Sequence, residues 1–272
     1  MSYQALNIIH SGAVTRLQLN RPESSNALTE AMHWELHRAL DAFAADESQR
    51  VCVIGAVGDR SFCSGSDLKE HIASGGVGHA YPPSGYAGLT ERFDLTKPVI
   101  AEVNGAAVGG GLELILACDL AIAVDTARFG LPEPLIGGVA LGLGIQRLAR
   151  HVGAKHASDL ALTGRLIEAP EALTLGLVNA VVPREQLSET TQLFVERLLA
   201  AAPNAQRASK AILANSFEYP TLPGAGRRTA GLSAVVAWVE ASEAAEGTRA
   251  FVERRRPIWD AAAPQLVDSP LD

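Results

Sequence analysis

Short apolar runs between helical patterns constrain the fold of this chain more than any other feature. Four of them occupy residues 50–58, 98–105, 120–124 and 176–183, and read RVCVIGAVG, PVIAEVNG, LAIAV and GLVNAVVP. Each is bounded by turn residues or by a helical pattern, as expected of strands buried on both faces. Apolar residues at helical spacing fill the segment 29–45, which begins with a plausible N-cap, Thr29. The alternation predicts an α/β fold with covered sheets.

The end of the chain differs from this alternating part. From about Pro203 to Glu253 the pattern is helical and rich in alanine. We therefore expect two regions, with the boundary between residues 200 and 205. Residues 1–202 would form a core that holds the active site, and residues 203–272 a helical region.

Two segments of the core have the composition of chain reversals. Residues 6–22 alternate as a hairpin does and turn at Ser11–Gly12, and Pro22 ends the pattern. Residues 73–88, ASGGVGHAYPPSGYAG, are rich in Gly, Pro and Ser. This segment predicts a loop of the length at which functional lids occur.

Composition disfavours several function classes. The chain has 272 residues, of which 47% are apolar, and a formal net charge of -7. A sizeable core is therefore possible, whereas nucleic acids and membrane surfaces call for basic proteins. The first residues have no basic segment followed by an apolar one, so we expect no signal peptide and a cytoplasmic location. Three cysteines lie far apart and fit reduced thiols rather than a disulfide framework or a zinc site: Cys52, Cys63 and Cys118.

A glycine triplet and a glutamate stand together in VNGAAVGGGLELILACD, residues 103–119. Glycines weaken regular structure, and a carboxylate in an apolar run is costly unless it is paired or neutralised. The pattern predicts a turn and then a helix from about Gly110, whose free N–H groups carry the positive end of the helix dipole. Glu113 is then either a first-turn partner of that dipole or a functional carboxylate. The spacings of a dinucleotide site and of a phosphate-binding loop are absent.

Two further stretches could carry chemistry. RSFCSGSDLKE, residues 60–70, predicts a strand-to-helix turn whose free N–H groups could hold an anion or an oxyanion; an ordinary turn capped by Asp67 is the alternative. Glu133 stands between Pro132 and Pro134, which stiffen the backbone. It is either a positioned acid or base or part of a surface turn.

The histidines form no metal-binding or catalytic-triad pattern. We expect most of them to be solvated on surface helices and loops: His10, His33, His37, His71, His79, His151 and His156. The basic run at 254–256 is typical of a solvated helix end. No metal site is expected.

Six segments, in order along nearly the whole chain, resemble the crotonase superfamily, also called the enoyl-CoA hydratase/isomerase family. They read LNRPESSNALT, SFCSGSDLKE, KPVIAEVNGAAVGGGLELILACDLAIA, ARFGLPEPLIGG, ALTGRLIEAPEALTLGLVNAVVP and EGTRAFVERRRP. The third is similar to the family pattern K-P-V-I-A-x-V-N-G-x-A-x-G-G-G-x-E-L. One such motif would be weak, and six in order are strong.

The resemblance implies an α/β spiral of ββα units with a C-terminal helical region that packs in homotrimers, often paired into hexamers. It implies an acyl-CoA thioester substrate and no metal or redox cofactor, since coenzyme A is part of the substrate. By position, the backbone N–H groups of Ser66 and Gly110 would form the oxyanion hole, and Glu113 and Glu133 would be the two glutamates of true hydratases. The CoA moiety would be lined by Ser24, Ser25, Ser64, Asp67 and Leu68.

These implied roles fit the chemistry of an enoyl-CoA hydratase in fatty acid β-oxidation. Syn addition of water to a 2-trans-enoyl-CoA places negative charge on the thioester oxygen, which two fixed N–H donors stabilise. Glu113 would activate the water. Glu133 would be the protonated partner that exchanges a proton with the α-carbon. Burial and mutual repulsion in a shared pocket would separate their pKa values.

One segment departs from the family pattern. The common P-G-A-G-G-T-Q-R-L is ALGLGIQRL here, residues 140–148. Leu141 and Leu143 replace small residues near the acyl pocket, so specificity for short straight chains does not follow from the resemblance. Ser66 replaces a frequent alanine, which we expect to matter little because the backbone donates.

Other functions of the same fold remain open at this point. An enoyl-CoA isomerase, or a dehydratase or hydratase of an acyl-CoA that is not a fatty acid, is the alternative within enzymes. Isomerases of the family commonly need one acidic residue, and the presence of both favours the hydratase. An RNA-binding member is disfavoured because the helix at 29–45 is not basic, and a silent homologue would have no need of both glutamates.

Overall fold

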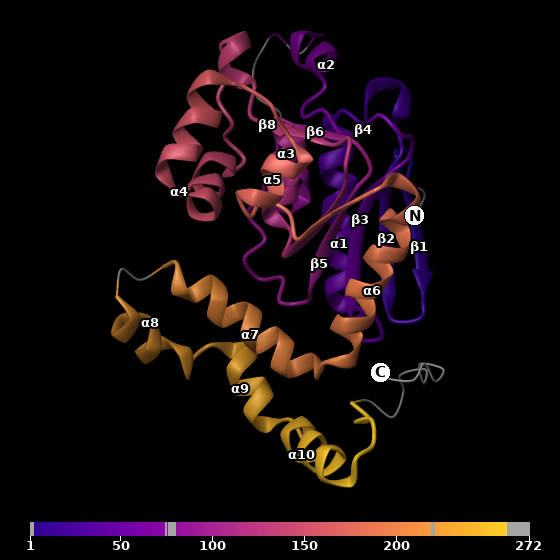
Figure 1. Ribbon diagram of the computed structural model, residues 1–272, viewed down its shortest axis with the longest axis vertical. Helices are drawn as coiled ribbons and strands as arrows, with labels where there is room; N and C mark the ends of the chain where they lie inside the picture. Colours follow the sequence, from indigo (N-terminus) through magenta and orange to yellow (C-terminus); the bar gives the residue numbers. More distant parts are fainter. Residues whose placement is uncertain (1–2, 74, 76–79, 219–220, 260–272) are drawn as a thin grey trace.

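Two sheets form the body of the protein in the computed structural model (Figure 1), which describes residues 3–73, 75, 80–218 and 221–259. The larger sheet has the order β1-β2-β3-β5-β7-β10, and the smaller has the order β4-β6-β8-β9. The larger sheet contains β1 (Leu6–Ser11), β2 (Val14–Leu19), β3 (Val51–Ala56), β5 (Val99–Val103), β7 (Leu120–Val124) and β10 (Ala180–Val182). The smaller sheet contains β4 (Ser61–Cys63), β6 (Ala106–Val108), β8 (Arg128–Gly130) and β9 (Ile167–Glu168). Only the pairs β1–β2 and β8–β9 are antiparallel among the described strands.

Helices follow the strands in a regular order. The α-helices are α1 (Glu30–Ala45), α2 (Leu68–Ala73), α3 (Gly110–Ala117), α4 (Gly144–Thr163), α5 (Ala169–Thr174), α6 (Leu187–Ala200), α7 (Pro203–Ser216), α8 (Leu222–Thr229), α9 (Ser233–Glu240) and α10 (Glu243–Glu253). Short 3-10 turns are η1 (Pro22–Ser24), η2 (Tyr86–Gly88), η3 (Glu133–Ile136) and η4 (Arg184–Gln186). Three pairs of consecutive strands repeat one arrangement: β3–β4, β5–β6 and β7–β8. In each pair the first strand belongs to the larger sheet and the second to the smaller sheet, and a helix follows. This repetition is the spiral of ββα units that the family resemblance implies.

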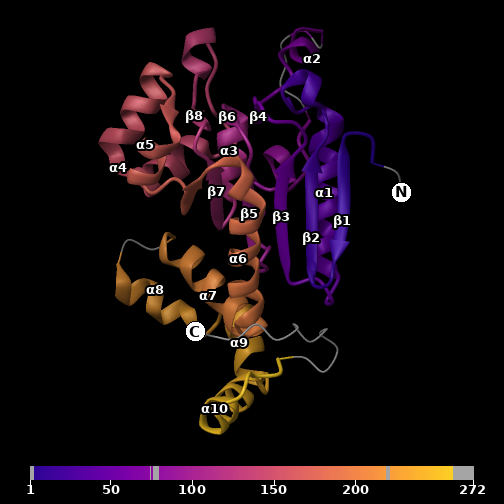
Figure 2. The same cartoon turned by 45° about the vertical axis from the view of Figure 1, so that its right-hand side comes forward.

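The predicted strands and the first helix are confirmed. The apolar runs form β3, β5, β7 and β10, and the hairpin turns after Ser11 as expected. The hydroxyl of Thr29 accepts a hydrogen bond from the Met32 N–H and caps α1. The helix packs its apolar face into the core through Met32, Leu36, Leu40 and Phe43, each at most 1% exposed. Figure 2 shows α1 beside β1, β2 and β3.

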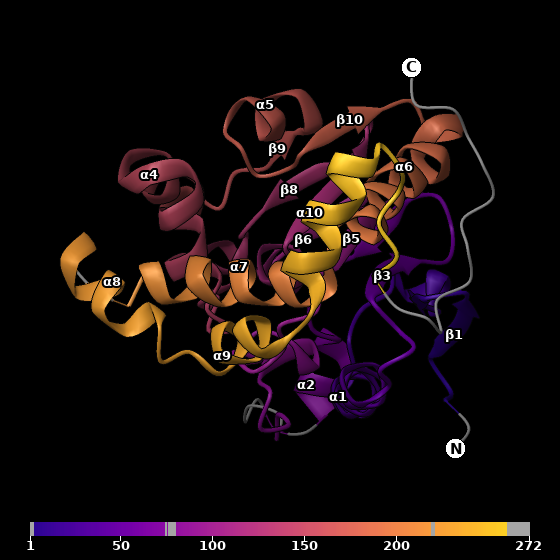
Figure 3. The same ribbon diagram turned by 90° about the horizontal axis from the view of Figure 1, so that it is seen from below.

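The C-terminal helices lie at one end of the body. In Figure 1, α7 to α10 gather below the sheets, away from α2 and α4, and in Figure 3, seen from below, α10 lies in front of the sheets. Ion pairs join α7 to the body: Lys210 Nζ lies 2.7 Å from Asp119 Oδ2, and Arg207 lies 3.0 Å from Glu47. The helical prediction for residues 203–253 is confirmed by α7 to α10 in the described part of that range. That these helices form a separate oligomerisation region stays a prediction.

In the part of the chain that the structure describes, no helix is both long and apolar enough to cross a membrane. Within the same residues, His, Cys, Asp and Glu side chains form no group of three or more that could hold a metal ion. The three cysteines are free thiols, as expected.

Candidate active site

Each glycine of the triplet meets a different neighbour. Gly109 has a φ of 56°, and a Cβ atom there would lie 3.0 Å from Glu133 Oε1. A Cβ on Gly110 would overlap the hydroxyl of Tyr86, and one on Gly111 would overlap the carbonyl oxygen of Cys63. The triplet therefore allows three groups to approach the start of α3 closely, which no other residue type permits.

Two backbone N–H groups are available beside this helix start. Gly110 is the first residue of α3, where an N–H has no intrahelical acceptor. On the neighbouring segment, Leu28 pairs with the Gly65 carbonyl and the Asp67 N–H, which leaves the intervening Ser66 N–H outside this pairing. A Cβ on Gly65 would lie 3.1 Å from the Gly110 nitrogen, so the two segments are in contact. Such paired amides can bind an anion or a developing oxyanion.

Glu113 lies in the first turn of α3, as predicted, and it is buried. Its side chain is 3% exposed, and its Oε1 accepts a hydrogen bond of 2.9 Å from the Gly144 N–H at the start of α4. Burial, and then the charge of Glu133, raise its pKa to about 7, although backbone hydrogen bonds from Gly144 and Gly142 lower it. A carboxylate that only complemented the helix dipole would face solvent and would have no need of this burial.

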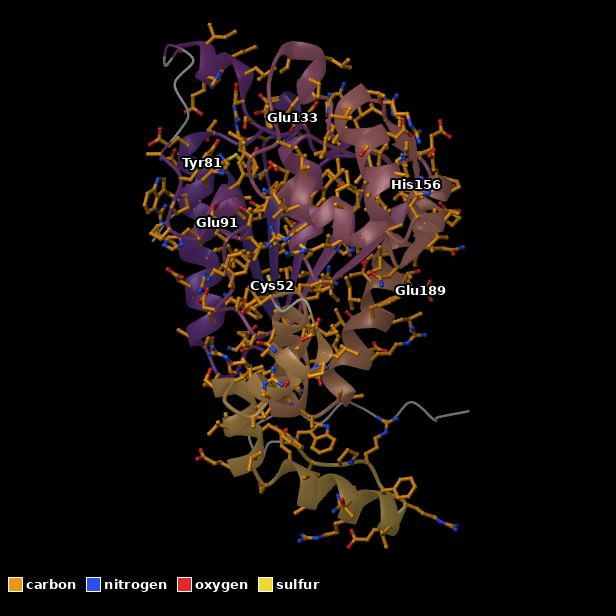
Figure 4. All side chains as sticks on the ribbon, turned by 90° about the vertical axis from the view of Figure 1, so that its left-hand side faces the viewer. Cys52, Tyr81, Glu91, Glu133, His156 and Glu189 are labelled. Carbon is orange, nitrogen blue, oxygen red and sulfur yellow. The ribbon has the colours of Figure 1, made fainter. Side chains whose placement is uncertain are left out.

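Glu133 begins η3 and borders the same site. Burial raises the pKa of its carboxyl group. Its Oε2 is buried and has no hydrogen-bond partner among the described residues. A buried carboxyl oxygen without a protein partner is available to a ligand. Figure 4 shows Glu133 and Tyr81 near the end of the molecule opposite the C-terminal helices.

An apolar cavity of about 440 Å³ adjoins Glu133. It is lined by Leu131, Glu133, Pro134, Gly138, Val139, Ala140, Ile145, Ala149, Ala154, Ala157, Ser158, Ala161 and Leu162. Neither of the predicted acyl-pocket residues is in this lining. Leu141 is 80% exposed, and Leu143 takes a left-handed conformation (φ 65°) just before α4. Their part in binding an acyl group stays a prediction.

The segments expected to line CoA are brought together by the fold. The Ser64 N–H donates to the Ser25 carbonyl at 3.1 Å, and Ser25 follows Ser24 with a left-handed φ of 54°. Asp67 is engaged by Arg21 at 3.0 Å and accepts from the first N–H groups of α2. Through these contacts Asp67 stabilises the loop between β4 and α2. Leu68, the next residue, is 52% exposed.

The structure also places residues in the site that the sequence did not reveal. Tyr86 is 5% exposed, and its hydroxyl lies 3.2 Å from Ser66 Oγ. His33 is an exception to the expectation that most histidines are solvated, because it is fully buried and accepts from the Ala87 N–H at 2.9 Å. Its ring packs 4.5 Å from that of Tyr86. The sequence signal that could have predicted this burial was the position of His33 beside Met32 on the apolar face of α1. Part of the predicted 73–88 loop, at 74 and 76–79 and including His79, lies outside the described residues.

Comparisons with known proteins point to one family. The sequence model of the enoyl-CoA hydratase/isomerase family matches residues 10–262. Carnitinyl-CoA dehydratases from Citrobacter koseri and Salmonella typhi are each 35% identical over 257 residues, covering 94% of this chain and 98% of theirs.

Solved structures show the same fold. An enoyl-CoA hydratase from Mycobacterium tuberculosis superimposes with a TM-score of 0.86 at 32% identity, covering 95% of this chain and 99% of that one. An enoyl-CoA hydratase from Bacillus anthracis gives a TM-score of 0.84 at 32% identity, covering 94% and 99%.

Proposed function

Because this chain belongs to the enoyl-CoA hydratase/isomerase family, we propose that it catalyses the reversible addition of water to a 2-trans-enoyl-CoA. One observation carries the proposal. Glu113 and Glu133 border the same helix start, where the Ser66 and Gly110 N–H groups are available. The product is a 3-hydroxyacyl-CoA, and the reverse reaction is its dehydration.

The two carboxyl groups divide the proton transfers. Glu113 takes a proton from water as the water oxygen bonds to the β-carbon. The electrons of the double bond move toward the thioester oxygen, where the Ser66 and Gly110 N–H groups stabilise the charge, an effect of about 3–4 kcal/mol per donor. Glu133 then delivers a proton to the α-carbon.

The surroundings of the glutamates support this division. Backbone hydrogen bonds from Gly144 and Gly142 favour the ionised form of Glu113, as a base requires. Burial raises the pKa of Glu133, which favours the protonated form that a proton donor needs. A carboxyl group with a pKa of about 7 also suits general base catalysis near neutral pH.

A panel of enoyl-CoA thioesters tests the proposal, with loss of absorbance of the conjugated double bond as the measurement. Glu113→Gln and Glu133→Gln should each lower kcat by about 10²- to 10⁴-fold with the fold intact. Glu189→Gln, an exposed position on α6 away from Glu133 in Figure 4, is the matched control and should leave kcat unchanged. No turnover of any panel member by the wild-type protein would refute the hydratase proposal.

Dehydration of carnitinyl-CoA is the second candidate, because relatives of that name are 35% identical to this chain. The cavity beside Glu133 bears on the choice. Its lining is mostly aliphatic, which favours a neutral hydrocarbon chain over a cationic one. The ratio of kcat/KM for carnitinyl-CoA to that for 3-hydroxybutyryl-CoA and its longer homologues decides between them. A ratio well above one would identify carnitinyl-CoA, and not a fatty acyl-CoA, as the preferred substrate.

A further inference from the structure

Tyr86 is a buried residue of the site to which the hydration mechanism gives no role. Its hydroxyl lies 3.2 Å from Ser66 Oγ and against the α-carbon of Gly110, where any Cβ would overlap it. Ser66 and Gly110 are the two residues whose N–H groups are available for an oxyanion. The phenol oxygen therefore contacts both sides of the proposed oxyanion site.

The backbone around Tyr86 is held in unusual conformations. Gly85, Ala87 and Gly88 all have positive φ angles, of 76°, 52° and 63°. Alanine rarely adopts such a conformation, which costs about 1–3 kcal/mol. Strain of this kind persists only where the surrounding structure fixes it, and it is concentrated at functional sites.

Several contacts on three sides of the turn fix this conformation. The Ala87 N–H donates to His33 on α1, and Gly88 lies so close to the α1 backbone at His37 that a Cβ would overlap it. On the N-terminal side, Ser84 Oγ lies 2.8 Å from His37 Nδ1. Beyond the turn, Arg147 of α4 donates to the Thr90 carbonyl at 2.7 Å. The ring of Tyr86 is thus positioned by α1 and α4 together.

On the basis of the hydratase function proposed above, we propose that the Tyr86 hydroxyl is a third donor of the oxyanion site, alongside the Ser66 and Gly110 N–H groups. Ser66 O–H donates to the phenol oxygen, and the phenol O–H donates to the thioester oxygen as charge develops on it. No proton is transferred in this contact. The electrons that reach the thioester oxygen return to form the carbonyl when the α-carbon is protonated.

The surroundings of Tyr86 keep it a donor. Burial raises the pKa of Tyr86 well above its usual value, and the charge of Glu113 raises it further. The phenol therefore stays protonated near neutral pH. The hydroxyl of Ser66 also gains a role, which its replacement of alanine in the sequence did not indicate.

Tyr86→Phe tests the proposal because it removes only the hydroxyl and keeps the ring against His33. We expect kcat for enoyl-CoA hydration to fall by about 10²-fold with KM nearly unchanged, as for the loss of one oxyanion donor. Tyr3→Phe removes the same atom outside the site and serves as the control. Ser66→Ala, which keeps the backbone N–H, should lower kcat less, and in the double variant the two effects should be less than additive.

The second measurement does not depend on turnover. Saturated butyryl-CoA labelled with ¹³C at the thioester carbon is bound to each variant, and the carbonyl stretch is recorded by infrared difference spectroscopy. Hydrogen bonds to the oxygen lower this frequency, so Tyr86→Phe should show a smaller shift than wild type and Tyr3→Phe the full shift.

The outcomes separate the two proposals. Wild-type kcat and carbonyl shift in Tyr86→Phe would overturn the role of Tyr86 and leave the hydratase function standing. A wild-type protein that binds butyryl-CoA with a Tyr86-dependent shift but hydrates no enoyl-CoA would support the third donor and refute the hydratase. Failure of the wild type to bind butyryl-CoA would overturn the donor proposal.

Discussion

Ionised Glu113 destabilises the folded protein, because its buried environment favours the protonated carboxyl group. Its pKa is raised to about 7 from an ordinary value of 4.5. The folded protein therefore binds a proton at this carboxyl more tightly than the unfolded chain does. This destabilisation is absent below the pKa of Glu113 in the unfolded chain and fully present above its pKa in the folded protein. The free energy of unfolding therefore falls as pH rises from about 4.5 to about 7.

Glu113→Gln should remove this pH-dependent term while keeping an oxygen for the Gly144 N–H. We expect the variant to gain stability over wild type as pH rises through this range, by an amount on the order of 3 kcal/mol at pH 8. Urea unfolding at pH 5 and pH 8 measures it. A difference between variant and wild type that is the same at both pH values would contradict the raised pKa.

The same carboxyl group controls the rate. As the base, Glu113 must be ionised, so kcat/KM for hydration should fall as pH drops below about 7. The pH profile of the wild type measures this limb. A flat profile between pH 5 and 8 would exclude a base with this pKa.

At the scale of elements, the junction between α3 and α4 holds the base in place. Gly142 and Gly144 both lie against Glu113: a Cβ on Gly142 would be 2.8 Å from its Oε2, and one on Gly144 would be 2.6 Å from its Oε1. Between them, Leu143 adopts a left-handed conformation that a non-glycine residue rarely takes. The alternating glycines of ALGLG are thus explained by the approach of α4 to a carboxylate on α3.

Gly144→Ala should displace the Glu113 carboxylate, because the new methyl group would overlap it. The backbone conformation of Gly144 is one that alanine can adopt. We expect a cost in stability of about 1–3 kcal/mol from overpacking, together with a fall in kcat. Gly226→Ala on α8 is the matched control, because a Cβ there meets nothing within 4 Å. Alanine in that helix should stabilise it by up to about 1 kcal/mol. An unchanged kcat in Gly144→Ala would contradict the requirement that Gly144 holds the Glu113 carboxylate in position.

At the scale of the whole molecule, the C-terminal helices carry several large apolar side chains on their surface. Large apolar side chains there are between 58% and 86% exposed: Phe217, Leu222, Val239, Phe251, Val252 and Ile258. In Figures 1 and 2 these helices lie apart from the active-site end. They are the surface on which the predicted trimer or hexamer would form.

Light scattering after gel filtration should give a mass near three or six times the 28.6 kDa of the chain. Replacing Leu222 and Phe251 by Glu should lower this mass, because the charges would be buried in the interface. Ile9→Glu, at a 47% exposed position on β1, is the control. A wild-type mass of one chain would refute the oligomer prediction.

The sequence by itself determined the alternation of strands and helices, the hairpin, the cap at Thr29 and the placement of Glu113 in a first helical turn. These depend on local periodicity and on backbone conformations that neighbouring residues enforce. It also singled out the glycine triplet and Glu133 as candidates for function, with a surface turn as the alternative for Glu133.

Only the tertiary structure decided which groups meet. Tyr86 contacts Gly110, and Gly144 holds Glu113, across 24 and 31 positions of sequence, so no local pattern reports either contact. The burial of His33 and the exposure of Leu141 depend likewise on which faces the neighbouring elements cover. A raised pKa or a strained turn is a property of surroundings assembled from distant segments, and the fold supplies those surroundings.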